Sequence, residues 1–195
     1  MILRIVSILF ISGFLFSCND DSAAGAAKKD SKEQSFFPVT RFIMGQLKEL
    51  DSLPVTPLKV VTISGKADSS WLKKQDIRIF AQPFLQPLID TENLRNLFSE
   101  KSFLDQTINS FTFSYDPVDK LPDTLKLKRW DVYVDPQKNI IKRIYLVKEE
   151  MINGERQVSQ LTWKANQWCK ITTILNHANR APDIKEEIMK WDFKE

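Results

Sequence analysis

The stretch Ile140 to Lys164, IIKRIYLVKEEMINGERQVSQLTWK, determines the fold. Two runs of alternating character, Ile140 to Ile152 and Glu155 to Lys164, are separated by the dipeptide Asn153-Gly154. Alternation with a period of two is the pattern of a β-strand, and Asn-Gly suits the two-residue turn of a β-hairpin. The stretch therefore predicts an antiparallel hairpin.

A similar pattern follows Lys101 nearly to the last residues and predicts a large antiparallel sheet. Turn-forming residues divide it into successive strands, which indicates a meander. Both faces of the run Ile140 to Ile152 carry apolar residues, so we expect helices to cover one face and curvature to shelter the other. The six predicted strands are Phe103 to Tyr115, Thr124 to Val134, Ile140 to Ile152, Glu155 to Lys164, Gln167 to Asn176, and Ile184 to Phe193.

The residues before this sheet show the apolar spacing of three to four that is typical of amphipathic helices. It predicts helices over Phe36 to Leu53, from Trp71 to near Leu88, and from Asp90 or Thr91 to Phe98. The β-branched run Leu58 to Ser64 predicts a strand that ends at Gly65. The expected fold is α+β, with two to three N-terminal helices packed on a curved antiparallel β-meander of about six strands.

The first residues predict an export signal. Arg4 precedes the apolar run Ile5 to Phe16, which is shorter than the roughly 20 residues that a membrane-spanning helix needs. The segment Leu15-Phe16-Ser17-Cys18 then resembles the lipobox of bacterial lipoproteins. The resemblance implies that residues 1–17 are a signal peptide, cleaved before Cys18, and that Cys18 carries the lipid. The chain would be held on a membrane without spanning it.

Asn19-Asp20-Asp21 resembles the acidic stretch that follows the lipidated cysteine in lipoproteins of Bacteroidota, where it is associated with surface export. Residues 18–35 contain no large apolar residue and predict a flexible tether. Residues 36–195 are expected to form a single α+β domain. The predicted location is the outer membrane of the cell envelope, facing either the periplasm or the exterior.

Charge and composition exclude one class of partner. The 28 basic and 25 acidic residues are interspersed, so no basic stripe for nucleic acid is present. The basic clusters within residues 126–129 and 138–143 are interpreted as solvated strand edges. Partners are therefore expected to be the membrane, through the lipid, and either an envelope protein or an apolar ligand.

The residues that could perform chemistry are few. Lipidation of Cys18 leaves Cys169 as a free thiol, expected to be a buried apolar residue, although a pair with His177, the one histidine, stays open. Phosphate-binding loops, dinucleotide fingerprints, nucleophile elbows and zinc spacings do not occur in the sequence. We expect no catalytic residue, no cofactor and no metal.

Carboxylates are the main remaining enzymatic candidates. Asp131 and Asp135 are predicted to share a strand face with Tyr133, and Glu186 and Asp192 to share a face of the last strand. Such rows are far more often exposed side chains than acid and base pairs. We therefore expect a protein that is not an enzyme.

Two aromatic residues are the candidates for a ligand groove. Trp163 and Trp168 flank the predicted Ala165-Asn166 turn, where the rings could line a sheltered rim or simply fill a core. Three functions remain: an envelope docking module, a carrier of a lipid or other apolar ligand between the sheet and its helices, and, more weakly, a carboxylate-dependent hydrolase. They predict, respectively, a filled core, a roomy apolar cavity and converging carboxylates with raised pKa values.

Overall fold

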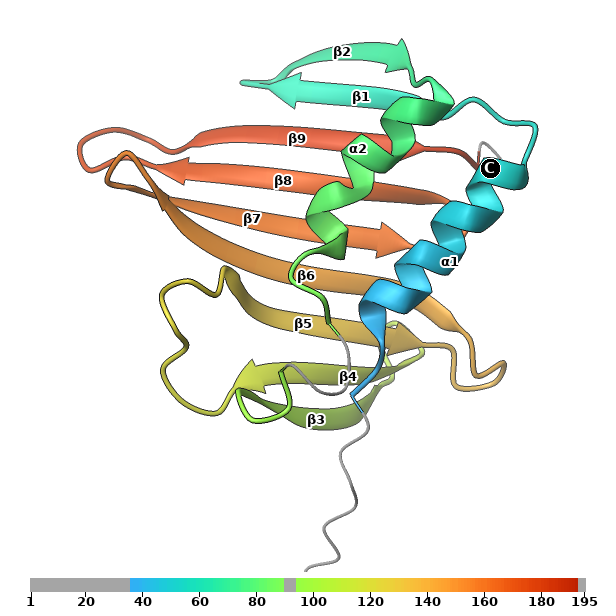
Figure 1. Cartoon of the computed structure of the whole chain (residues 1–195), viewed down its shortest axis with the longest axis horizontal. Helices are drawn as coiled ribbons and strands as arrows, with labels where there is room; N and C mark the ends of the chain where they lie inside the picture. The colour runs from blue at the N-terminus through green and yellow to red at the C-terminus, as the bar shows by residue number, and fades with distance from the viewer. Residues whose placement is uncertain (1–35, 90–93, 193–195) are drawn as a thin grey trace, which may run out of the picture. The chain divides into compact units, whose positions relative to one another are not determined.

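The computed structural model of the chain describes residues 36–89 and 94–192 (Figure 1). Within these residues nine antiparallel strands form one sheet in the order β2-β1-β9-β8-β7-β6-β5-β4-β3, and two helices lie on the same face of it (Figure 1). The elements are α1 (Val39–Ser52), β1 (Leu58–Ile63), β2 (Lys66–Trp71), α2 (Lys74–Leu85), β3 (Phe98–Asp105), β4 (Ser110–Pro117), β5 (Leu127–Val134), β6 (Ile141–Ile152), β7 (Glu155–Lys164), β8 (Trp168–Asn176) and β9 (Asp183–Lys190). The α+β class and the antiparallel meander are confirmed, but the sheet has nine strands rather than about six.

The hairpin of β6 and β7 has the predicted turn. Ile152 pairs with Glu155 across Asn153 and Gly154, whose φ angles are 51° and 82°. Positive φ at both central residues is the requirement of a type I′ turn, which matches the twist of the flanking strands. The register fixed by this turn places the buried side chains of both strands on the same face of the sheet.

One predicted strand is two strands in the structure. The run Phe103 to Tyr115 is divided by the turn at residues 106–109 into the end of β3 and most of β4. The Oδ1 atom of Asp105 accepts a hydrogen bond from the backbone N–H of Thr107 at 2.9 Å, and Asn109 has a φ of 45°. The turn is therefore made by polar side chains that bond to nearby backbone, without glycine or proline.

A second unpredicted strand follows Gly65. Ser64 and Gly65 have φ angles of 49° and 77°, so Gly65 belongs to a tight turn between β1 and β2 rather than to the end of an isolated strand. Trp71 accordingly ends β2, and α2 begins at Lys74. Because β1 also pairs with β9, this early hairpin extends the sheet next to its last strand.

The predicted third helix is not present in the described part of its range. Residues 90–93 lie outside the described residues, and Phe98 begins β3. Between them a turn forms, in which the backbone N–H of Leu97 donates to the oxygen of Leu94 at 3.0 Å. Leu94 and Phe98 are buried as expected, but they reach the core from a turn and a strand.

The two helices are held by one apolar stripe each. Phe84 of α2 packs on Trp163 of the sheet, with ring centroids 5.3 Å apart. Between the helices, the Nη2 of Arg78 lies 2.6 Å from the Oδ2 of Asp51. The buried helix residues are Val39, Thr40, Ile43, Leu47 and Leu50 in α1, and Ile77, Phe80, Ala81 and Phe84 in α2. Their spacing of three to four is the periodicity that the sequence showed.

Two glycines with opposite backbone requirements test this fold. We expect Gly154→Ala to lower the free energy of unfolding by about 1 kcal/mol or more, because a Cβ strains a residue whose φ is 82°. Gly45 lies inside α1 with open space around its Cα, so Gly45→Ala should raise stability by about 1 kcal/mol. Urea unfolding of both variants measures the difference. Equal effects of the two substitutions would contradict the assigned turn.

Candidate functional site

The space between the helices and the sheet is filled by aromatic side chains. The ring of Trp130 lies 4.6 Å from that of Tyr115 and 4.7 Å from that of Phe98, measured between centroids. The ring of Trp163 contacts Phe84 and lies 5.4 Å from that of Trp191. Trp130 and Trp163 are both fully buried. This packing leaves the rings in contact with each other rather than around a ligand.

A groove opens beside α2, where the helices leave parts of β6, β7, β8 and β9 uncovered. Its volume is 720 Å³, within the size range of ligand sites in proteins. One wall is α2 with the residues that follow it, and the other is the loop before β5. The residues that line it are Ile79, Gln82, Pro83, Gln86, Pro87, Thr124, Leu125, Lys126, Lys148, Glu150, Gln157, Ser159, Leu161, Ile171, Thr173 and Glu187. Polar and charged side chains therefore make up most of its floor.

Lys148 fastens β6 to the end of α2 at this groove. Its Nζ donates hydrogen bonds to the backbone oxygens of Pro83 and Gln86. A cation at the C-terminal end of a helix is favourable because it meets carbonyl groups with no partner inside the helix. Burial lowers the pKa of Lys148 to about 8. Lys148 therefore lines the groove and connects β6 to the end of α2.

The other charges in the groove are paired within the chain. Lys126 forms an ion pair with Glu150. Glu187 lies 3.0 Å from the Nζ of Lys59 and 2.9 Å from the Nζ of Lys185, and hydrogen bonds from these lysines outweigh burial to lower the pKa of Glu187. With these charges paired, the groove offers hydroxyl groups and the amides of Gln82 and Gln157 to a partner, although Gln157 also donates to Glu150 at 3.3 Å.

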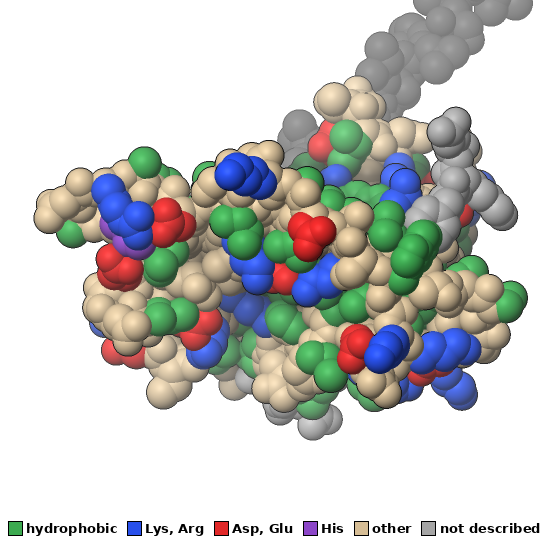
Figure 2. All heavy atoms as spheres, turned by 90° about the horizontal axis from the view of Figure 1, so that it is seen from above, with side chains coloured by type: hydrophobic (Ala, Val, Ile, Leu, Met, Phe, Trp, Pro, Cys, Tyr) green, Lys and Arg blue, Asp and Glu red, His purple; other side chains and the backbone are tan. Residues whose placement is uncertain are grey.

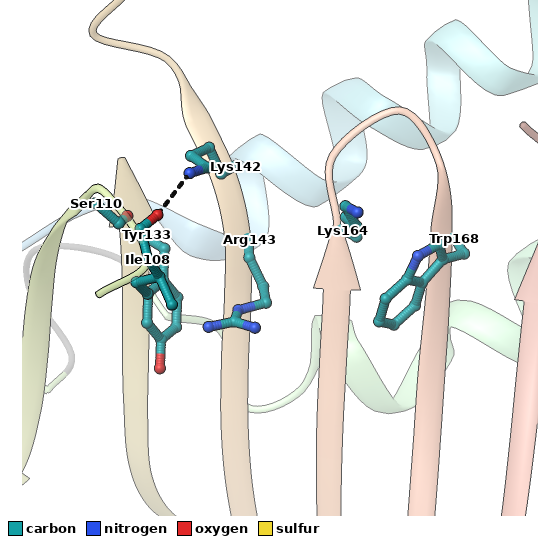
Figure 3. Close-up of a pocket in the computed structure, with 7 residues that line it drawn as sticks. All are labelled: Ile108, Ser110, Tyr133, Lys142, Arg143, Lys164 and Trp168. Atoms are coloured by element: carbon teal, nitrogen blue, oxygen red, sulfur yellow. Dashed lines mark hydrogen bonds between the residues drawn. The ribbon is translucent and has the colours of Figure 1, made fainter. Parts of the chain in front are cut away.

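The structure does not bring together the two tryptophans predicted to line a groove. Trp163 pairs with Cys169 and Lys164 pairs with Trp168, so the two indoles point to opposite faces of the sheet. Trp163 belongs to the core beneath α2. Trp168 is half-buried on the open face, the face opposite the helices, where it lines a separate hollow of 230 Å³ (Figure 3).

Cys169 and His177 do not form a catalytic pair. Cys169 is a free, fully buried cysteine, and burial raises the pKa of its thiol well above the usual value. Such a thiol is a poor nucleophile, since the thiolate is the reactive form. His177 follows the other end of β8, and eight residues of extended chain separate the two by about 26 Å. Cys169 is the buried apolar residue that the sequence predicted.

His177 instead joins a charged cluster at one end of the sheet (Figure 2). Its Nδ1 lies 2.7 Å from an oxygen of Glu155, and its Nε2 lies 2.9 Å from Asp183. Hydrogen bonds to Glu155 and Asp183 raise the pKa of His177, although the positive charge of Arg180 acts to lower it. The cluster connects β7 to the loop between β8 and β9 and is a local structural clamp.

The carboxylates of the predicted rows contact nearby groups of the chain. Asp131 is buried on β5 and binds the guanidinium of Arg129 at 3.1 Å. Asp135 lies beyond the end of β5, where hydrogen bonds from the backbone N–H groups of Lys138 and Gln137 lower its pKa. Glu186 lies 3.2 Å from the Nζ of Lys170, and β9 ends before Asp192. These groups do not form the closely spaced pair that glycoside hydrolysis requires.

No family model, curated protein or solved structure matches the chain. Across residues 36–89 and 94–192, no three His, Cys, Asp or Glu side chains are grouped to hold a metal ion. In the same part of the chain no helix combines the length and apolar character needed to cross a membrane. Cys18, the predicted lipid attachment site, lies outside the described residues.

The single histidine gives a direct test of the charged cluster. We expect the Hε1 resonance of His177 to titrate above pH 6.5, because Glu155 and Asp183 stabilise the imidazolium. The resulting stabilisation should be fully present below pH 6.5 and lost as the pH rises through the raised pKa of the folded state. NMR titration measures the midpoint, which should fall in an Asp183→Asn variant. A midpoint at or below 6.5 in the unmodified chain would contradict the cluster.

Proposed function

We propose that the chain is an exported lipoprotein, anchored to the outer membrane through Cys18, whose folded domain is a non-enzymatic module that docks to an envelope protein. The export signal and the lipobox-like segment support the location and the anchor. The groove beside α2 supports the docking role, because it is an open surface that presents polar side chains together with apolar ones beside a packed core. This groove is the single observation that favours a binding module.

The chemistry of the groove favours an extended polypeptide as its occupant. Gln157 and Ser159 on β7 and Thr173 on β8 lie in its floor, and Gln82 of α2 lines the same groove. Amide and hydroxyl groups both donate and accept hydrogen bonds, as the backbone of an extended peptide does. The paired charges of the groove give little reason for a charged ligand to bind there.

The carrier and hydrolase alternatives have less support. A carrier needs apolar space, whereas the rings of Trp130 and Trp163 occupy the region under the helices and Lys148, Glu150 and Thr173 face the open groove. A carboxylate-dependent hydrolase needs an acid with a raised pKa. The carboxyl groups with a displaced pKa in the described residues are all displaced downward, namely Asp135, Glu149, Asp183 and Glu187.

Lipidation is tested by metabolic labelling with an alkynyl palmitate. The full chain should incorporate the label, and Cys18→Ala should abolish incorporation because the acylated sulfur and amino terminus are formed only at that cysteine. Cys169→Ala is the matched control and should retain the label, since Cys169 is buried in the core. Label that persists in Cys18→Ala would contradict the anchor.

Docking through the groove is tested by photo-crosslinking in intact cells. A benzophenone amino acid in place of Ile79, which is 72% exposed at the groove wall, should give a discrete crosslinked protein species. The same amino acid in place of Met44, which is 55% exposed on α1 away from the groove, is the control and should not. Adding Ser159→Lys should lower the yield at Ile79 several-fold by filling the floor.

The proposal fails if position 79 gives no species, or if positions 44 and 79 give the same one. It also fails if Ser159→Lys leaves the yield unchanged while circular dichroism shows the native fold.

A further inference from the structure

A row of basic and aromatic side chains crosses the open face of the sheet. Tyr133 on β5 pairs with Arg143 on β6, Arg143 pairs with Lys164 on β7, and Lys164 pairs with Trp168 on β8. Directly paired residues on neighbouring strands point to the same face. Because neighbouring strands are about 4.8 Å apart, the row extends about 14 Å across the sheet. Its members come from four consecutive strands.

The hollow along this row concentrates positive charge. Its lining residues are Ile108, Ser110, Tyr133, Lys142, Arg143, Lys164 and Trp168, three of which are cationic and none acidic. In the described part of the chain, Lys142, Arg143 and Lys164 form no ion pair. The basic groups in the groove beside α2, by contrast, are neutralised by nearby carboxylates or bound to carbonyls. The charge of Lys142 contributes to the lowered pKa of Asp135, but three half-buried cations that form no ion pair still favour an anion as ligand.

Two of the three cations, Arg143 and Lys142, are held in place by contacts that leave them able to bind. The guanidinium carbon of Arg143 lies 4.0 Å from the ring centroid of Tyr133, a cation–π contact that orients the group. The Nζ of Lys142 donates to the backbone oxygens of Ile108 and Asn109 at 3.2 and 3.3 Å. A lysine ammonium has three donors, so one remains for a ligand. The site is thus organised before any ligand arrives.

An aromatic ring borders the same hollow on its far side. Figure 3 shows the indole of Trp168 on one side of the end of β7 and the side chains of Arg143 and Tyr133 on the other. Arg143 and Trp168 are two strands apart, about 10 Å, with Lys164 on the strand between them, so a ligand that reaches from the cations to the indole would have to span this distance. The half-buried indole presents a flat apolar surface to such a ligand.

We propose that this hollow binds a phosphorylated sugar, with the phosphate on Arg143, Lys142 and Lys164 and the sugar ring on Trp168. A phosphate monoester carries about −1.5 to −2 charges at pH 7, which matches three cations better than the single charge of a carboxylate. Arg143 supplies planar, two-pronged hydrogen bonding to phosphate oxygens. The site is on the face of the sheet opposite the groove beside α2, so it is independent of the docking proposal.

The test is calorimetric titration of the full chain in a non-ionic detergent. The ligands are glucose 6-phosphate, inorganic phosphate, glucose and dihexanoyl-phosphatidylglycerol, the last to distinguish a lipid headgroup from a free sugar phosphate. We expect glucose 6-phosphate to bind more tightly than inorganic phosphate, glucose not to bind, and added salt to weaken binding. Arg143→Gln should weaken it about ten-fold or more, and Lys164→Gln several-fold.

Two further variants complete the design. Trp168→Leu should remove the preference for glucose 6-phosphate over inorganic phosphate, because only the ring contact is lost. Lys120→Gln, a charge change on the exposed loop before β5, is the control and should bind like the unmodified chain. If only the soluble lipid binds, and Arg143→Gln abolishes that binding, the hollow is still a phosphate site but its natural ligand is a lipid headgroup rather than a free sugar phosphate. Binding of neither phosphate ligand, or equal losses in Arg143→Gln and Lys120→Gln, would overturn the proposal.

Discussion

Aromatic side chains of the sheet pack in one core with the two helices, and this contact removes part of one face of the nine-stranded sheet from water. Trp130 and Trp163 are at the centre of it, each surrounded by further rings. Burying a side chain of this size contributes about 2 kcal/mol or more. This burial stabilises the helices in their position on the sheet. The other features of the molecule follow from which parts of the sheet this packing covers.

The helices cover only part of their face, and the opposite face has no helix in the described residues. Beside α2 the strand ends form a groove whose charges are paired within the chain, with Lys126 on Glu150 and Lys59 on Glu187. On the open face, Arg143 has an aromatic neighbour but no acidic partner in the described part of the chain. The two surfaces therefore differ in the chemistry they offer, and we propose a polypeptide as the partner of the first and an anion as the ligand of the second.

The sequence predicted the parts of the fold that depend on local pattern. Asn153-Gly154 specifies its own turn, so the hairpin of β6 and β7 was predicted correctly. The exposed edge strand Lys66–Trp71 was missed because it has no apolar face, and its place depends on pairing with β1. The shared groove expected for Trp163 and Trp168 required the register of β7 against β8, in which one residue of shift reverses the face of a side chain. The row of paired residues on the open face depends on register in the same way.

A packed interior beneath the helices distinguishes a docking module from a carrier, because a carrier needs an apolar cavity there. A fluorescence titration with N-phenyl-1-naphthylamine, a neutral apolar dye, measures it on the full chain in the absence of other ligands. The packing of Phe84 and Trp163 predicts no saturable binding to the folded protein. Saturable binding of one dye per chain, accompanied by tryptophan quenching, would contradict the account.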